Sequence, residues 1–235
     1  MNILCTIHAR KDSEGLKNKN IKLLNSRPLI VYTIDQAIKS KLFDKVVVST
    51  DSKKIQKIAK KNSAYSWFLR QKKLSASSSG KIYAIRDTLI RSEIFFKKKF
   101  DIVVDLDVTS PLRKIKDIKN SFKSFIKNNF EILFSVCEAK KNPYFNMVEI
   151  VKKRIKLVKT ANTIVKSRQE APKVYELNAS IYIWNRDVLL KKNTLITKKT
   201  GIYIMPVQRS LDIDNKFDFD IVSYLMRKSK MKDKF

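Results

Sequence analysis

The sequence has few of the residues on which the common nucleotide loops and metal centres depend. Glycine occurs three times in 235 residues, and neither Gly-Lys-Ser/Thr of a Walker loop nor the dinucleotide fingerprint Gly-x-Gly-x-x-Gly is present. The chain has one histidine, His8, and two cysteines, Cys5 and Cys137, with no Cys-x-x-Cys pair. This composition argues against a zinc site.

Long apolar runs are absent as well. No stretch approaches the roughly 20 apolar residues that a membrane span requires, and the N-terminus lacks the basic and then apolar pattern of a signal peptide. Both cysteines lie in apolar, strand-like runs, and two buried thiols suit a reducing compartment. We therefore expect a cytoplasmic protein without a membrane partner.

Acidic residues are scarce, with 22 Asp and Glu against 51 Lys and Arg, which gives a formal net charge of +29. Clustered cations would indicate nucleic-acid binding, because they neutralise phosphates and release counterions. However, the longest uninterrupted basic runs have three residues, at 97–99 and 152–154. The scattered cations favour a solvated basic surface, and nucleic acid is not expected as a partner.

Strand and helix patterns alternate through the first part of the chain, which predicts an α/β fold built on βαβ units. Apolar, β-branched runs predict strands at residues 3–7, 45–50, 100–107 and 131–137, with a short strand at 64–69. Apolar residues spaced three and four apart predict helices at 29–40, 81–97 and 117–128, and a helix that Asp51 and Ser52 cap and that ends at Lys61.

The alternation breaks at residues 137–178, which contain strand-like residues 147–151 and a basic hairpin near 152–157. This stretch is interpreted as a small inserted subdomain for substrate binding and dimerisation. Residues 1–136 and 179–235 then form the α/β core, with strands at 179–184 and 201–207 and helices at 187–191 and 216–226.

The loop after the first strand is a candidate phosphate site, because ligands in α/β sheets bind at the carboxyl ends of strands. Within ten positions this loop holds one glycine and the cations Arg10, Lys11, Lys17 and Lys19. Arginine offers a fork of donors and lysine a point charge, and both suit phosphate oxygens. A merely solvated loop explains the same residues equally well in a chain this rich in lysine.

Two pairs of carboxylates are candidate site residues. Asp105 and Asp107 end a buried strand, where an unpaired charge is costly. Asp212 and Asp214 lie two apart in an extended segment, so both point to one side, as ligands of Mg²⁺ would. Capping of the last helix by Asp214 is the competing explanation.

Several motifs in order resemble those of the acylneuraminate cytidylyltransferase family, from about residue 2 to residue 225. They are Ala9-Arg10 with Ser13, Gly15 and Lys19-Asn20; Ser49-Thr50-Asp51; Thr109-Ser110-Pro111-Leu112-Arg113; Arg168-Gln169; Asn178-Ala179-Ser180-Ile181-Tyr182-Ile183; and Asp212-Ile213-Asp214 with Asp218-Phe219. The resemblance implies a Rossmann-like nucleotidyltransferase sheet with helices on both faces. It also implies transfer of CMP from CTP to the anomeric hydroxyl of a nonulosonic acid, with release of pyrophosphate.

The same resemblance assigns roles to residues, with catalysis carried by Arg10, Lys19, Asp212 and Asp214. Nucleotide binding would fall to Arg10, Lys17, Lys19, Asn20, Arg70, Ser79 and Lys81, and sugar binding to Asp107, Thr109, Arg168, Gln169 and Tyr182. Asp214, helped by Asp212, would hold Mg²⁺ and assist deprotonation of the sugar hydroxyl. The family's members are homodimers in which the inserted subdomain reaches the partner's active site.

The sequence also departs from the family pattern. Glu14 stands where a phosphate-binding lysine is usual, and we expect Lys17 or Lys11 to supply the missing charge. Asp107 replaces the usual Gln, and together with Asn142-Pro143-Tyr144-Phe145 this favours the branch acting on legionaminic-type sugars. A CMP-Kdo synthetase and a non-catalytic descendant that binds nucleotide or an anionic surface are the alternatives.

Overall fold

The computed structural model describes residues 1–12, 15–74, 80–161 and 165–232. Its centre is a six-stranded sheet in the order β10-β6-β9-β5-β1-β4. The strands are β1 (Ile3–His8), β4 (Lys45–Ser49), β5 (Ile102–Leu106), β6 (Ile132–Glu138), β9 (Tyr175–Asn185) and β10 (Thr200–Ile204). Apolar, β-branched residues that are buried on both faces account for the central strands.

Strand direction in the sheet is mostly parallel. β1 pairs in parallel with β4 and β5, and β10 pairs in parallel with β6. β9 is antiparallel to both of its neighbours, β5 and β6. The carboxyl ends of β1, β4 and β5 therefore meet at one edge, which is where side chains from their following loops can converge.

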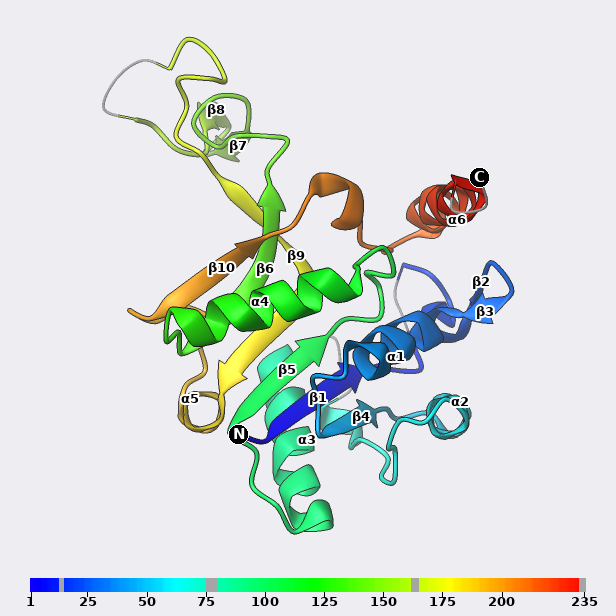
Figure 1. The fold of residues 1–235 in the computed structure, drawn as a ribbon. Coiled ribbons are helices and arrows are strands. Elements are labelled where there is room, and N and C mark those ends of the chain that lie inside the picture. The colour runs from blue at the N-terminus through cyan, green and yellow to red at the C-terminus, as the bar shows by residue number, and fades with distance from the viewer. Residues whose placement is uncertain (13–14, 75–79, 162–164, 233–235) are drawn as a thin grey trace.

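Helices cover both faces of the sheet (Figure 1), which confirms the expected α/β class. Residues of α3 (Lys81–Phe96) and α5 (Arg186–Lys191) pack in one apolar core. The other core holds residues of α1 (Leu29–Ser40), α2 (Lys53–Lys61), α4 (Ile115–Lys127) and the last helix, α6 (Lys216–Lys232). Short elements complete the fold: η1 (Lys19–Ile21), the hairpin β2 (Leu23–Leu24) and β3 (Arg27–Pro28), η2 (Lys72–Leu74) and η3 (Val207–Arg209).

One expected strand is wrong. Residues 64–69 make only two isolated bridges, Tyr65 to Val47 and Leu69 to Thr50, instead of a continuous strand beside β4. Between them Trp67 stacks on Phe95 of α3, with ring centroids 4.2 Å apart. Backbone hydrogen bonds of Tyr65 to β4, together with packing of this aromatic side chain on the helix, hold the segment in place.

The inserted segment stands away from the sheet (Figure 1), and we call residues 139–174 the arm. It contains a hairpin of β7 (Val148–Val151) and β8 (Arg154–Leu157), whose turn residues Lys152 and Lys153 have positive φ. β6 and β9 stay paired as far as Glu138 and Tyr175 and form the two-stranded ribbon that carries the arm. The ends of the predicted insertion, residues 137–138 and 175–178, therefore belong to these two strands. Within the described ranges no helix is both long and apolar enough to cross a bilayer.

Candidate active site

The first loop and the acidic segment before α6 meet at the carboxyl edge of the sheet. Lys19 Nζ donates to the carbonyl of Ile213 at 2.6 Å and lies 3.3 Å from Asp214 Oδ1. A Cβ at Gly15 would lie 2.2 Å from the carbonyl oxygen of Asp214, so only glycine allows this approach of the two backbones. Residues almost 200 positions apart in sequence thus share one site.

The base of the first loop is held by a hydrogen bond within the loop and by another to a residue just beyond β4. Asn20 is buried, and its Nδ2 donates to the carbonyl of Arg10 at 2.9 Å. The amide of Lys11 donates to Asp51 Oδ1 at 2.7 Å, just beyond β4. These contacts fix the loop backbone on which the predicted phosphate-binding cations stand.

Arg70 is the buried cation of this region. Its amide donates to the carbonyl of Thr50 at 2.8 Å, and only 7% of the residue is exposed. Burial lowers the pKa of its guanidinium, and the charge of Asp51 partly offsets that effect. Lys17, by contrast, is exposed, while Glu14 and Ser79 lie outside the described residues.

Asp212 and Asp214 are held differently. Asp212 has a buried oxygen, Oδ1, without a hydrogen-bond partner among the described residues, and burial together with the charge of Asp107 raises its pKa from 3.8 to about 6. The side chain of Asp214 is 75% exposed beside Lys19. Asp212 is half-buried and Asp214 faces solvent, so both residues have carboxylate oxygens that can serve as ligands at this edge of the sheet.

The capping explanation for Asp214 is wrong. Asn215 Oδ1 accepts from the amide of Asp218 at 3.0 Å, and Asp218 Oδ2 accepts from the amides of Asp214 and Asn215 at 3.0 and 3.1 Å. The N-terminus of α6 is therefore capped by the side chains of Asn215 and Asp218. The carboxylate of Asp214 stays available for another role.

The acidic pair fits a hard divalent cation such as Mg²⁺. A buried carboxylate oxygen that lacks a donor, beside a second carboxylate, is the donor chemistry that Mg²⁺ accepts, with water and phosphate oxygens filling its other positions. No group of three or more His, Cys, Asp or Glu side chains suited to a metal occurs in the described part of the chain. The pair thus resembles a site completed by a phosphate ligand more than a closed protein cage.

On the α3 side of the edge, Lys81 bridges the two carboxylates that end β5. Its Nζ lies 2.9 Å from Asp105 Oδ2 and 2.8 Å from Asp107 Oδ2, and 4.8 Å from the ring centroid of Tyr182. Burial favours the neutral acids, but the charge of Lys81 outweighs it and lowers the pKa of both Asp105 and Asp107. Thr109 donates to Asp107 Oδ1 through its amide at 3.2 Å and its hydroxyl at 2.9 Å.

Two predicted sugar residues lie elsewhere. Arg168 and Gln169 are exposed and line a hollow of about 450 Å³ at the base of the arm, together with Lys140 and Asn142. Tyr182 lines a separate cavity of about 210 Å³ with Lys81 and Trp184. One chain alone does not place Arg168 and Gln169 beside Tyr182.

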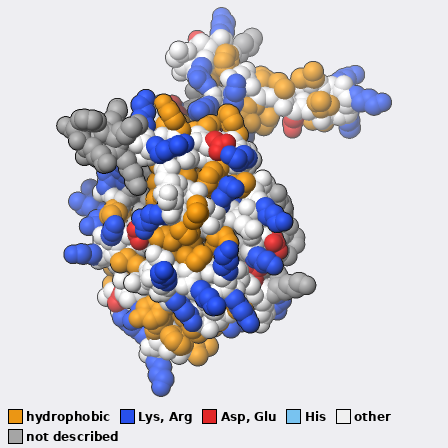
Figure 2. Space-filling model, turned by 90° about the vertical axis from the view of Figure 1, so that its right-hand side faces the viewer, with side chains coloured by type: hydrophobic (Ala, Val, Ile, Leu, Met, Phe, Trp, Pro, Cys, Tyr) orange, Lys and Arg blue, Asp and Glu red, His pale blue; other side chains and the backbone are white. Residues whose placement is uncertain are grey.

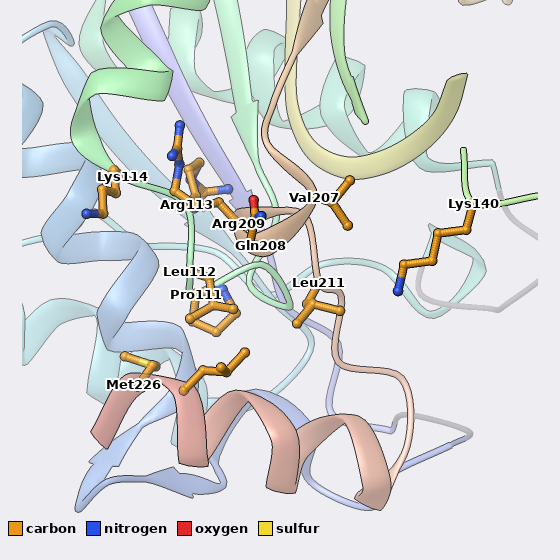
Figure 3. Close-up of a pocket in the computed structure, with 11 residues that line it drawn as sticks. Pro111, Leu112, Arg113, Lys114, Lys140, Val207, Gln208, Arg209, Leu211 and Met226 are labelled. Carbon is orange, nitrogen blue, oxygen red and sulfur yellow. The ribbon is translucent and has the colours of Figure 1, made fainter. Parts of the chain in front are cut away.

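A larger cavity lies next to the acidic segment but contains none of the predicted site residues. It measures about 550 Å³ and opens between α6, the loop after Ser110 and the turn that includes η3 (Figure 3). Its wall includes Arg209, whose guanidinium donates to the buried Asp117 at 2.7 and 2.9 Å. This ion pair fastens the chain just before Asp212 to the start of α4.

Sequence reasoning did not include His8 among the candidate site residues. Its Nδ1 lies 2.7 Å from Asp105 Oδ1 and its Nε2 lies 3.1 Å from Thr88 Oγ1. The signal available was the spacing: Thr6 and His8 are two apart on β1 and point to the same face, and Thr6 also donates to Asp105, at 2.8 Å.

Comparisons with known proteins agree with this geometry. The family model described as cytidylyltransferase matches residues 4–233. The chain is 43% identical to the post-translational flagellin modification protein B of Campylobacter coli over 99% of this chain and 98% of that protein. It is also 43% identical to a CMP-N,N'-diacetyllegionaminic acid synthase of Campylobacter jejuni, over 95% and 94%. A solved CMP-2-keto-3-deoxy-manno-octonic acid synthetase with CTP superposes with a TM-score of 0.72 at 13% identity, covering 97% of this chain and all of that one.

Proposed function

The chain belongs to the cytidylyltransferase family, and from that premise we propose that it transfers CMP from CTP to the anomeric hydroxyl of a nonulosonic acid of the legionaminic or sialic type. The products are the CMP-sugar and pyrophosphate. The observation that carries the proposal is the meeting of Lys19 with Asp214, because it puts a cation and metal-binding acids on the same side of one site. The 43% identity to a CMP-N,N'-diacetyllegionaminic acid synthase supports the legionaminic branch.

Binding of CTP falls to the first loop. Arg10 and Lys19 hold phosphates, Lys17 adds an exposed charge at the same loop, and Asn20 and Arg70 hold the cytidine. The transfer needs little covalent chemistry from the protein, because positioning and neutralisation of phosphate charge supply most of the catalysis. Ser79 and Lys81 would line the same nucleotide site, and Ser79 lies outside the described residues.

Asp212 and Asp214 are the residues that would hold Mg²⁺. When bound, this ion neutralises phosphate charge and polarises the phosphoryl group that is attacked. The raised pKa of Asp212 fits this role, because a cation supplies the missing partner of its buried oxygen. The same pair of carboxylates offers a local acceptor for the proton of the anomeric hydroxyl.

Sugar recognition combines two parts of the protein. Asp107, Thr109 and Tyr182 face the sugar from the core, whereas Arg168 and Gln169 lie at the arm. We place these arm residues over the site of a second copy, in a homodimer. The arm extends from the body and carries hydrophobic and basic side chains (Figure 2), among which Ile150 and Ile155 are 77% and 73% exposed. Such exposed apolar side chains are typical of an interface.

Light scattering tests the dimer. The wild-type protein is expected at twice the monomer mass, and the double variant Ile150→Asp and Ile155→Asp at the monomer mass. If arms act in trans, mixing this double variant with an Asp214→Asn protein, whose arm is intact, should restore turnover. If they do not, the mixture should show no recovery. A monomeric wild-type protein with full activity would contradict the dimer.

The activity is tested by measuring pyrophosphate release from CTP and Mg²⁺ against a panel of sugar acids. The panel contains N,N'-diacetyllegionaminic acid, N-acetylneuraminic acid, pseudaminic acid and Kdo, and anion-exchange chromatography identifies each CMP-sugar. Turnover with Kdo alone would favour the CMP-Kdo synthetase. No turnover with any acid, accompanied by salt-sensitive binding of nucleic acid, would favour the non-catalytic alternative.

The variant Lys17→Ala tests the compensation for Glu14. Unchanged CTP affinity and turnover would exclude a share for Lys17. We assign the activity to the cytoplasm, where the buried thiols of Cys5 and Cys137 stay reduced.

A further inference from the structure

Four ionisable side chains form a continuous line beneath the sugar side of the site, in the order His8, Asp105, Lys81 and Asp107. Successive members are 2.7, 2.9 and 2.8 Å apart. They come from β1, β5, the first residue of α3 and the turn after β5, so the line connects three elements of the core. The proposed reaction assigns roles to Lys81 and Asp107 and leaves His8 and Asp105 without one.

His8 has a polar partner at each ring nitrogen. Asp105 is fully buried, and its lowered pKa keeps it an acceptor toward a proton on His8 Nδ1. Nε2 lies 3.1 Å from the Thr88 hydroxyl, which is also 2.8 Å from the carbonyl of Ala84. A ring that carries its proton on Nδ1 therefore makes both contacts at once.

Asp105 in turn limits where the ammonium of Lys81 can lie. Its Oδ1 accepts from Thr6 and His8, which leaves Oδ2 facing Lys81. Without His8 the buried carboxylate would lose one of its donors and its attraction for Lys81 would grow. The ammonium would then move toward Asp105 and away from Asp107.

Asp107 depends on the same ammonium. Its Oδ1 already accepts two hydrogen bonds from Thr109, and its Oδ2 accepts from Lys81. The orientation of this carboxylate toward the site is therefore set by Lys81 on one side and Thr109 on the other. Tyr182, under the ammonium, forms the floor of the same corner.

We propose that His8 and Asp105 are positioning residues: His8 donates from Nδ1 to Asp105 and holds it, which fixes Lys81 between the two carboxylates and so orients Asp107 for the sugar acid. The hydrogen-bonding part of the proposal stands on the contacts of these side chains. The part that concerns the sugar rests on the proposed function.

The first test uses the fact that His8 is the single histidine of the chain. Nitrogen NMR of the ¹⁵N-labelled protein is expected to show a ring proton on Nδ1. In Asp105→Asn the Nδ1 signal should shift, because its charged acceptor is gone. The matched control is Glu93→Gln, which breaks the ion pair of Glu93 with Arg186 near the other end of α3 and should leave the His8 signals unchanged. A wild-type ring whose Nδ1 carries no proton would overturn the proposal.

The second test is kinetic. His8→Leu removes the donor to Asp105, whereas His8→Asn retains a donor in the place of Nδ1. We expect His8→Leu to raise KM for the sugar acid about tenfold or more while KM for CTP stays within about twofold, and His8→Asn to recover most of the loss. Glu93→Gln should lower Tm without this selective change.

The outcomes separate the two proposals. The positioning role would be overturned if KM for the sugar acid and KM for CTP changed together in His8→Leu. It would also be overturned if neither KM changed in a folded variant. If the wild-type protein turns over no sugar acid, the proposed function fails, and the NMR result still decides whether His8 is held as described.

Discussion

Replacement of Asp212 by Asn is expected to stabilise the folded protein at pH 8 in the absence of divalent metal. Burial and the nearby charges of Asp107 and Asp214 raise the pKa of Asp212 from 3.8 to about 6. A raised carboxyl pKa means that the folded state binds the proton more tightly than the unfolded state does. The ionised form therefore destabilises the fold above that pKa, and asparagine removes this destabilisation.

The size and pH range of the effect follow from the shift. A difference of about 2 pKa units corresponds to about 3 kcal/mol as an upper limit, and because the residue is only half-buried we expect about 1–2 kcal/mol. Below about pH 4 both states are protonated and the gain vanishes. It grows as the pH rises through the range between the two pKa values, and it is complete above about pH 6.

The assay is urea unfolding of the wild-type protein and Asp212→Asn at pH 5 and pH 8, with EDTA present. Asp214→Asn is the control, since its exposed carboxylate should change the free energy of unfolding by less than about 1 kcal/mol. Addition of Mg²⁺ and CTP should reverse the order, because only the wild-type protein has both proposed ligands. A variant that is no more stable than wild type at pH 8, or equally stabilised at both pH values, would refute the reasoning.

Three further substitutions have defined outcomes. Gly15→Ala forces a Cβ onto the backbone of Asp214, so KM for CTP should rise at least about tenfold in steady-state assays with little change in Tm. Gly201→Ala puts a Cβ 2.2 Å from the ring of Phe130, and chemical denaturation should show a loss of about 1–3 kcal/mol with kcat unchanged. Ala179→Gly relieves a φ of 51° within β9 and should raise the free energy of unfolding by up to about 1 kcal/mol; equal or lower stability would contradict that strain.

Local patterns were sufficient to predict most elements of the core. The helices α1 and α4 show as regularly spaced apolar residues, and the strands β1, β4 and β5 show as apolar runs. Both patterns reflect burial of residues that are close in sequence, so they can be recognised from the sequence alone. The antiparallel direction of β9 could not be predicted, because it depends on how the chain returns from the arm. The positive φ at Ala179, close to a register shift between Phe134 and Val136, is likewise invisible in sequence.

Part of the candidate site could also be predicted from local sequence patterns. Residues that follow parallel strands share an edge, so the first loop and Asp107 could be placed together from sequence, and their spacing of two marked Asp212 and Asp214 as candidate metal ligands. The start of α3 at Lys81 was predicted, but the contact of Lys81 with Asp105 could not be foreseen, because it depends on how the helix packs against the sheet. His8 was missed because a histidine at a strand end can have many roles, and only its contacts with Asp105 and Thr88 distinguish them.

The distribution of acids explains how a protein of net charge +29 would hold the proposed divalent cation. Asp105 and Asp107 pair with Lys81 and Asp214 pairs with Lys19, whereas Asp212 has a buried oxygen without a donor and no such ion pair among the described residues. Its raised pKa shows that the surrounding cations do not compensate it. Positive side chains scattered over the surface can attract CTP toward the whole molecule, whereas, among these acids, the carboxylate without a paired cation is confined to Asp212. High salt should therefore slow CTP binding by screening the surface, and should affect the short-range contacts of Asp212 much less.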